Sequence, residues 1–301
     1  MATYQPNNET YVRPTPGKAH VILLGGQSNA SGWALRDILA ANIPAEQMAR
    51  YDNGFENVLI AYNCDKNVSE EFVPVKMGQG LKDECGTVRF GPEIGIAEHL
   101  TRTYPNEVFY IIKSSTSSSG LADVNGVFPN WLDGGTVLDE FKSTVRSALE
   151  RMEASGLEPE IFAMAWMQGE TDSLVLDTAK AYAGREAELL GHLYESFGSY
   201  MAPGGMAFLD AGIYEVPHFT YSAYLNRSKR EFVQASINHY FLDTNGHGLD
   251  TIHEATQLAD PSVIDMNHYD TDDMLKLGNL FGEAISLVLT NAEQSANRFP
   301  N

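Results

Sequence analysis

The chain has 301 residues and carries 40 acidic against 20 basic side chains, a formal net charge of −20. Hydrophobic residues make up 43% of it, enough for a large core and too many for a disordered chain. The acid excess argues against nucleic acid and anionic membrane as partners, since both require a basic surface. No apolar run approaches the roughly 20 residues of a membrane span. The polar N-terminus lacks the features of a secretory signal, which leaves the cytoplasm, or export with the signal removed, as locations.

Cys64 and Cys85 are the only cysteines, so a disulfide framework and a zinc site made of cysteines are excluded. One disulfide between them stays open. No linker-like stretch separates two halves of the chain. We therefore expect an N-terminal extension over residues 1–18 and a single domain over residues 19–301.

Short apolar runs alternate with helical patterns along the chain. Apolar runs without polar alternation predict strands buried on both faces, over residues 19–24, 57–62, 108–112, 161–167, 206–209 and 240–242. Helical periodicity predicts helices over residues 92–104, 137–154, 174–201, 221–237 and 274–289. This alternation predicts an α/β fold, a three-layer sandwich with a mainly parallel central sheet. Ligands of such sheets bind beyond the carboxyl ends of the strands.

The first polar motif, GGQSNASG at residues 25–32, follows the first strand directly. A serine on a glycine turn can present its hydroxyl in the crevice, where helical N–H groups would face a developing oxyanion. The alternative is a plain turn in which Ser28 or Asn29 caps a helix. The motif is neither the GxSxG elbow of α/β-hydrolases nor a phosphate loop, because no lysine follows.

Two further motifs lie at element boundaries. In RFGPE, residues 89–93, Gly91 would present its N–H group in the same crevice, although Pro92 also fits an ordinary helix start. In WMQGETD, residues 166–172, Gln168 could donate to an oxyanion and Glu170 could anchor the loop. The alternative for the second motif is a strand-to-helix connection with Asp172 as a cap.

The motif DMNH, residues 265–268, offers a general base and its partner from one loop. An attacking serine needs a base of histidine's pKa, and that imidazole needs an acceptor on its other nitrogen. The alternative is a helix start with an acidic first turn at residues 270–273. Asp210 and Asp243 are rival partners for His268.

Metal and sugar sites are weaker interpretations. The spacing of His247 and His253 matches no helical ligand pair, and the aspartates at 270–273 lack the glycine and glutamate of a calcium loop. We therefore expect neither a metal nor a cofactor. Trp33 and Trp131 have the aromatic faces that suit a sugar ring, or they pack in the core or at its rim.

Taken together, the blocks resemble the SGNH (GDSL-like) hydrolase superfamily, and more narrowly carbohydrate esterase family 6 and the sialate O-acetylesterase-like domains. The resemblance spans about residues 19–290 and also includes Lys113 with Gly120 and Trp131, and the Leu277-Gly278 pair. One departure is the serine-rich loop after Lys113, where the family often has a GGT-like turn. We expect this loop to border the acyl or alcohol pocket.

The resemblance implies Ser28 as nucleophile, His268 as general base and Asp265 as its orienting carboxylate. It implies an oxyanion hole from the Ser28 and Gly91 N–H groups and the Gln168 side chain. We expect supporting or substrate-binding roles for five more residues, namely Gln27, Asn29, Lys113, Glu170 and Trp131.

The predicted function is hydrolysis of short-chain, acetyl esters on carbohydrates through an acyl-enzyme. The expected partner is a small-molecule or carbohydrate ester, and the oligomeric state stays open. The alternatives are a broad short-chain carboxylesterase without a sugar substrate, and a non-catalytic carbohydrate-binding module. Because this chemistry uses few charges, we expect most of the acid excess on solvated helix faces such as residues 186–195 and 270–273.

Overall fold

The computed structural model describes residues 4–82, 86–251, 254–257 and 260–290. Cys85 and His253 lie outside the described residues. The possible disulfide between Cys64 and Cys85 and the possible metal pair of His247 and His253 therefore also lie outside them. Among the described residues, no helix has both the length and the apolarity that crossing a membrane would require.

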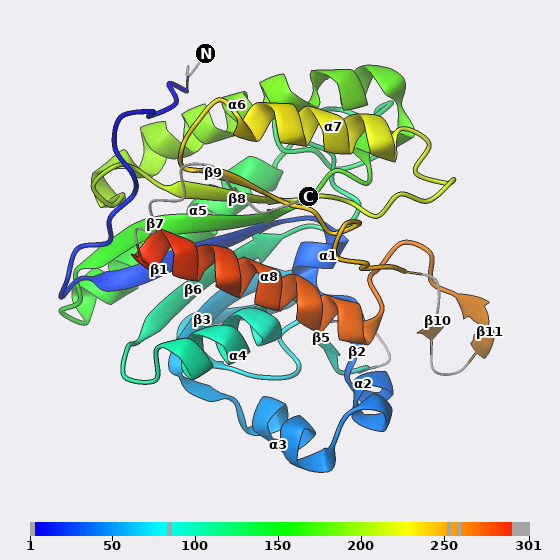
Figure 1. Ribbon diagram of the computed structural model, residues 1–301, viewed down its shortest axis with the longest axis horizontal. Helices are drawn as coiled ribbons and strands as arrows, with labels where there is room; N and C mark the ends of the chain where they lie inside the picture. Colours follow the sequence, from blue (N-terminus) through cyan, green and yellow to red (C-terminus); the bar gives the residue numbers. More distant parts are fainter. Residues whose placement is uncertain (1–3, 83–85, 252–253, 258–259, 291–301) are drawn as a thin grey trace.

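A seven-stranded sheet in the order β4-β3-β6-β1-β7-β8-β9 forms the centre of the fold (Figure 1). All neighbours in it pair parallel except β3 and β4. The parallel strands are β1 (Ala19–Gly26), β3 (Phe55–Cys64), β6 (Phe109–Ser115), β7 (Pro159–Met167), β8 (Ala207–Ala211) and β9 (His239–Leu242). Each corresponds to one of the apolar runs, which confirms the prediction of a mainly parallel sheet.

Within the main sheet, the strand that the sequence did not predict is β4 (Asn67–Val75). It runs antiparallel to β3 at the edge of the sheet. Its residues are mostly exposed or half-buried, because an edge strand needs no continuous apolar run. Two small antiparallel pairs lie outside the main sheet: β2 (Ala34–Leu35) with β5 (Arg89–Phe90), and β10 (Ala255–Gln257) with β11 (Asp260–Ile264).

Helices cover both faces of the sheet, α4 and α8 in front and α5 behind in the view of Figure 1. The five predicted helices are present as α4 (Glu93–Thr103), α5 (Val137–Ala154), α6 (Leu176–Phe197), α7 (Ser222–Val233) and α8 (Thr271–Thr290). Three shorter ones precede them, namely α1 (Ser28–Ser31), α2 (Arg36–Asn42) and α3 (Ala45–Asn53). Two 3₁₀ turns flank α6, η1 (Asp172–Leu174) and η2 (Gly198–Tyr200).

The crossing of α4 and α8 is unusually close. A Cβ atom on Gly278 would lie 2.2 Å from the carbonyl oxygen of Pro92, and one on Gly95 would lie 2.3 Å from that of Leu275. Glycine at both positions lets the two helix starts touch. The loops that precede these helices, which carry Gly91 and His268, are thereby brought to the same end of the sheet.

The carboxyl ends of three central strands lie side by side at that end. Gly26 of β1 pairs with Ser115 of β6 on one side and with Met167 of β7 on the other. The motifs that follow these strands therefore start from adjacent points, as parallel strand order requires.

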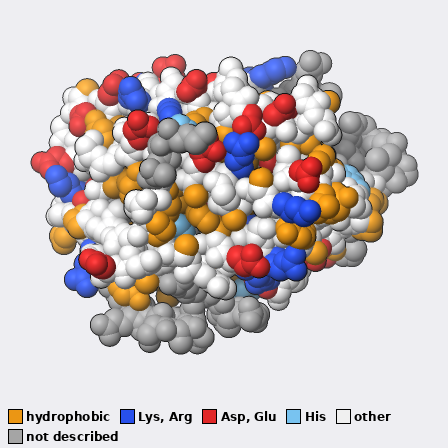
Figure 2. Space-filling model, turned by 90° about the horizontal axis from the view of Figure 1, so that it is seen from above, with side chains coloured by type: hydrophobic (Ala, Val, Ile, Leu, Met, Phe, Trp, Pro, Cys, Tyr) orange, Lys and Arg blue, Asp and Glu red, His pale blue; other side chains and the backbone are white. Residues whose placement is uncertain are grey.

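The acid excess is only partly distributed as expected. Acidic side chains are spread over the face shown in Figure 2, with basic ones among them. However, Glu186 is fully buried, and Asp270 and Asp273 are each only 6% exposed. The expectation of solvated faces at residues 186–195 and 270–273 is therefore wrong for these carboxyl groups, because both segments turn one side inward.

Candidate active site

The turn that carries Ser28 is fixed by Gly26. This glycine has φ of +141°, and a Cβ atom there would lie 1.9 Å from the carbonyl oxygen of Met167. Only glycine allows the chain to leave β1 so close to β7. Ser28 follows as the first residue of α1 and is 6% exposed. Within the described residues its N–H group has no protein acceptor, as expected for a first helical residue.

His268 is bound to Asp265 in the loop before α8. Its Nδ1 lies 2.8 Å from Oδ2 of Asp265, whose Oδ1 accepts the N–H groups of Asn267 and His268 at 2.9 and 3.1 Å. Burial disfavours the charged carboxylate, but the hydrogen bond and charge of His268 hold the pKa of Asp265 below its ordinary value. The ionised carboxylate keeps a proton on Nδ1, which leaves Nε2 to act as a base.

The rival aspartates are engaged elsewhere. Asp210 accepts a hydrogen bond from Lys229 at 2.5 Å, and both side chains are fully buried. Asp243 pairs with Arg230 at 2.7 Å. Asp265 is therefore the carboxylate that the fold gives to His268.

Asn29 connects the serine turn to the histidine loop. Its Oδ1 accepts the N–H group of Tyr269 at 3.1 Å, and its Nδ2 donates to the carbonyl oxygen of Asn267 at 3.2 Å. The residue after Ser28 is thus bound to both residues that flank His268. Ser28 Oγ itself makes no hydrogen bond within the described residues, which is common before substrate binds.

Glu170 supports this connection from the loop that follows β7. Its Oε1 accepts a 2.6 Å hydrogen bond from Nδ2 of Asn29, and burial raises the pKa of Glu170. The structure places both side chains beside the serine turn, and their supporting roles stay a prediction.

One cavity opens beside His268, and a larger one adjoins it. The narrow one is lined by Trp33, Arg89 and Asp265, among others, and includes His268 itself. The larger one has a volume of about 580 Å³ and shares Glu254 and Asp270 with the narrow one. Its charged lining is five carboxylates and one lysine, namely Asp250, Glu254, Asp270, Asp272, Asp273 and Lys276. Three of these carboxylates (Asp250, Asp270 and Asp273) place oxygens within 4.8 Å of one another.

Comparison with known proteins decides the family. The family model of the carbohydrate esterases described as sialic acid-specific acetylesterases matches residues 18–286. The chain belongs to this family. It is therefore an acetylesterase of the carboxylic-ester hydrolases, with the SGNH-type fold that the sequence blocks predicted. A search of curated proteins gave no match.

Two solved structures share the fold of this esterase. A protein of Arabidopsis thaliana is 14% identical, with 89% of this chain and 98% of that one covered and a TM-score of 0.62. NanS is also 14% identical, with 91% and 98% covered and a TM-score of 0.62. At this identity the likeness concerns the fold alone.

In the esterase, the N–H group of Gly91 already has a protein acceptor. It donates to Oε1 of Glu93 at 2.8 Å, and Oε2 of Glu93 is paired with Lys113 at 2.8 Å. Lys113 also donates to the carbonyl oxygens of Ser31 and Gln79, at 2.9 and 3.0 Å. Lys113 and Glu93 are fully buried, so Lys113 supports the end of α1 and does not contact substrate. The sequence reasoning missed Glu93, although it stands two residues after Gly91.

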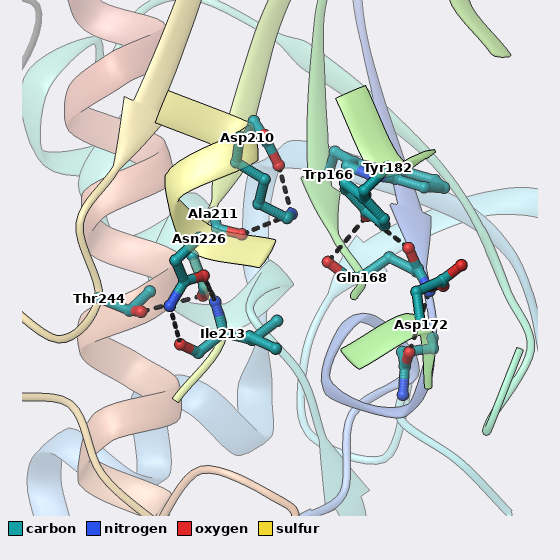
Figure 3. A network of polar contacts seen from close by, with 12 residues as sticks. Trp166, Gln168, Asp172, Tyr182, Asp210, Ala211, Ile213, Asn226 and Thr244 are labelled. Carbon is teal, nitrogen blue, oxygen red and sulfur yellow. Dashed lines mark hydrogen bonds and ion pairs between the residues drawn. The ribbon is translucent and has the colours of Figure 1, made fainter. Parts of the chain in front are cut away.

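Gln168 is held in a buried network (Figure 3). Its Nε2 has three acceptors, the carbonyl oxygen of Ser119 at 2.9 Å, Oδ2 of Asp172 at 2.7 Å and Oε1 of Gln27 at 3.2 Å. Its Oε1 accepts the hydroxyl of Tyr182 at 2.5 Å. Both amide hydrogens are therefore engaged, and as placed Gln168 offers no free donor to an oxyanion. It instead fixes Gln27, the residue before the serine.

Asp172 is the anionic centre of this network. It also accepts the N–H groups of Leu121 and Ala122, at 2.8 and 3.1 Å. Burial raises the pKa of Asp172 to about 6, against the opposing effect of these hydrogen bonds. The alternative in which Asp172 only caps a helix is thus replaced by a link between the loop of Gln168 and the loop of Leu121 and Ala122.

Trp131 lies in the core. It is 1% exposed and packs against Trp166 and Phe141, with ring centroids 4.9 and 5.4 Å apart. Its Nε1 donates to Oγ of Ser119 at 3.1 Å. The substrate-binding interpretation of Trp131 is wrong because the ring is covered. Its contact with Ser119 instead supports the loop after β6.

Proposed function

We propose that this esterase removes acetyl groups from carbohydrates through an acyl-enzyme on Ser28. The observation that carries the proposal is the bridge made by Asn29, which holds the serine turn against both neighbours of His268. A carbohydrate-binding module would have no need for a serine, a paired histidine and a fixed distance between their loops.

The reaction follows from the positions of three side chains. Ser28 Oγ attacks the ester carbonyl while Nε2 of His268 takes its proton, and Asp265 stabilises the imidazolium. The C–O bond to the sugar then breaks as His268 returns the proton to the departing oxygen. Water repeats the sequence on the acyl-enzyme and releases acetate.

The oxyanion needs donors aimed at it. The N–H group of Ser28 is the one of the three expected donors without a protein acceptor among the described residues. Gly91 and Gln168 would have to exchange an internal hydrogen bond for one to substrate. We therefore assign the first donor to Ser28 and a supporting role to the other two in the resting enzyme.

The larger cavity favours a neutral sugar. Its carboxylates can accept hydrogen bonds from sugar hydroxyls, but they repel a sugar that itself carries a carboxylate. We expect acetylated neutral glycans to be hydrolysed faster than O-acetylated sialic acid. A broad carboxylesterase would instead show no preference for sugar acetates over simple alkyl acetates.

The test compares two buried serines that each begin a helix. Ser28→Ala should lower p-nitrophenyl acetate hydrolysis by at least about 10³-fold. Ser222→Ala is the matched control, because Ser222 opens α7 and is 5% exposed against 6% for Ser28. The control should retain activity within about twofold. A Ser28→Ala enzyme that keeps more than a few per cent of the rate would rule out Ser28 as nucleophile.

A substrate panel then separates the two esterase hypotheses. Acetate release is measured from acetylated xylan, O-acetyl sialic acid and a simple alkyl acetate, and p-nitrophenol release from a chain-length series of p-nitrophenyl esters gives the acyl-length preference. The proposal requires a higher kcat/KM for an acetylated neutral sugar than for the alkyl acetate. The reverse order would favour the broad carboxylesterase.

A further inference from the structure

Trp33 lies flat against the proposed base. The indole and the imidazole of His268 are parallel to within 3°, with ring centroids 4.3 Å apart. Trp33 follows α1 with only Gly32 between, so the same short segment carries Ser28 and the ring that covers His268.

The stack restrains a motion that the carboxylate leaves open. The hydrogen bond from Nδ1 to Asp265 fixes one direction within the imidazole plane, but the ring can still rotate about that line. Contact with a flat indole restrains the plane itself. Together the two contacts fix the direction in which the lone pair of Nε2 points. Proton transfer from a serine hydroxyl requires such a fixed direction.

The indole is itself held by the serine-rich loop. Nε1 of Trp33 donates to Oγ of Ser117 at 3.3 Å. The Ser117 hydroxyl donates to Oδ2 of Asp65 at 2.6 Å, and its N–H group reaches the same carboxylate at 3.1 Å. Asp65 follows β3 at the turn into β4, so the β3–β4 hairpin supports this contact.

Arg89 restrains Trp33 from the β2–β5 pair. Its guanidinium carbon lies 4.6 Å from the indole centroid, and its Nη1 donates to the carbonyl oxygen of Trp33 at 2.6 Å. Arg89 is 5% exposed. An indole fixed at its ring, its Nε1 atom and its backbone is suited to hold another ring in place, because it has little freedom of its own.

We propose that Trp33 is a positioning residue for His268, with Asp65 and Ser117 as its anchor. The proposal rests on the proposed function, because it concerns the general base of that reaction. It also gives the serine-rich loop a role, since Ser117 in this loop provides the acceptor for the indole Nε1–H.

The experiment uses Trp33→Ala, Trp33→Phe and Ser117→Ala. Trp33→Ala should lower kcat on p-nitrophenyl acetate by about 10–100-fold with KM changed less than about twofold, because a misdirected base slows chemistry more than binding. Trp33→Phe keeps an aromatic face, and its kcat should lie within about fivefold of the wild type. The kcat of Ser117→Ala should lie between those of Trp33→Ala and Trp33→Phe. Tyr110→Ala is the matched control, since Tyr110 is a half-buried aromatic of β6 that packs on Phe72.

A spectroscopic readout separates positioning from general loss of structure. In enzyme isotope-labelled at histidine Cε1, the His268 signal is assigned by its absence from His268→Asn. The indole ring current should displace this signal upfield in the wild type, and the displacement should disappear in Trp33→Ala and persist in Tyr110→Ala. This measurement is made on the resting enzyme and needs no turnover.

Two results would overturn the proposal. One is a Trp33→Ala enzyme with wild-type kcat, whatever its signal. The other is an unchanged His268 signal in Trp33→Ala. If Trp33→Ala does not fold, Ser117→Ala decides, and wild-type values of both kcat and signal in that variant would contradict the anchor. Full activity in Ser28→Ala together with the expected signals would refute the nucleophile and leave the stack intact.

Discussion

The bridge made by Asn29 predicts a large effect on rate from a residue that touches no reacting atom. Asn29→Ala removes three buried hydrogen bonds, to Glu170, Asn267 and Tyr269. Each group left unpaired costs about 1–3 kcal/mol, so the loss of stability for three groups is about 3–9 kcal/mol. A domain in the upper part of the ordinary range, where unfolding costs about 10–15 kcal/mol, remains folded after this loss.

The rate should suffer more than the stability suggests. Without the bridge, the loops of Ser28 and His268 are no longer tied to each other, and a displacement of about 1 Å costs about 10²-fold in rate. We therefore expect kcat on p-nitrophenyl acetate to fall by about 10²-fold with KM little changed. The assay pairs this rate with a urea denaturation curve.

The control for this prediction is Asn226→Ala. Asn226 is 2% exposed, like Asn29, and its two hydrogen bonds to the backbone of Ile213 are drawn in Figure 3. A third, to Glu215, gives it the same number of hydrogen bonds as Asn29. It should lose similar stability and keep kcat within about threefold. Equal loss of kcat in both variants would rule out a special effect of the Asn29 bridge on rate, because the loss would then follow stability alone.

Three further predictions concern charge. Asp265→Asn should lower kcat by about 10–100-fold, which is less than the loss in Ser28→Ala. Because the pKa of Asp265 is lowered, its contribution to stability should be present above about pH 4 and lost only as pH falls further. Denaturation curves of the wild type and Asp265→Asn at several pH values measure this contribution. Asp172 should have the opposite effect. Its pKa is raised to about 6, so folding favours the protonated form, and stability should decline by up to about 3 kcal/mol as pH rises from about 4 to 6. Asp172→Asn should lack this dependence on pH. Activity should persist in about 1 M salt, where exposed charges are screened. Added salt should also raise kcat/KM for O-acetyl sialic acid relative to an acetylated neutral sugar, because it screens the repulsion by the carboxylates of the larger cavity. A fall in that ratio would argue against this cavity as the sugar site.

The sequence predicted the strands of the sheet and the main helices because their signals are local. A run such as residues 161–167 is buried on both faces, and its continuous apolar composition predicts this burial. The edge strand β4 was not predicted because its residues are mostly exposed or half-buried and form no continuous apolar run. The pairing of Asp265 with His268 was predictable for the same reason as the strands, since three residues separate them in one loop.

Contacts between distant segments were not predictable in this way. Composition gives Gln168 the chemistry of an oxyanion donor, but only the fold shows that its amide group is engaged by Ser119 and Gln27, which lie 49 and 141 residues away in the sequence. Likewise, nothing in the sequence shows that Trp131 is covered while Trp33 lies against His268. Burial and orientation depend on the packing of whole elements, which single-residue patterns do not contain.

Acylation of Ser28 is the step on which the proposed function depends. It is measured by intact and peptide mass spectrometry after reaction with a fluorophosphonate, and after rapid acid quench during turnover of p-nitrophenyl acetate. If Ser28 is the nucleophile, we expect one modification per chain, located on the peptide that contains Ser28, lost in Ser28→Ala and retained in Ser222→Ala. Modification of a different residue, or acetate release without any labelled serine, would contradict it.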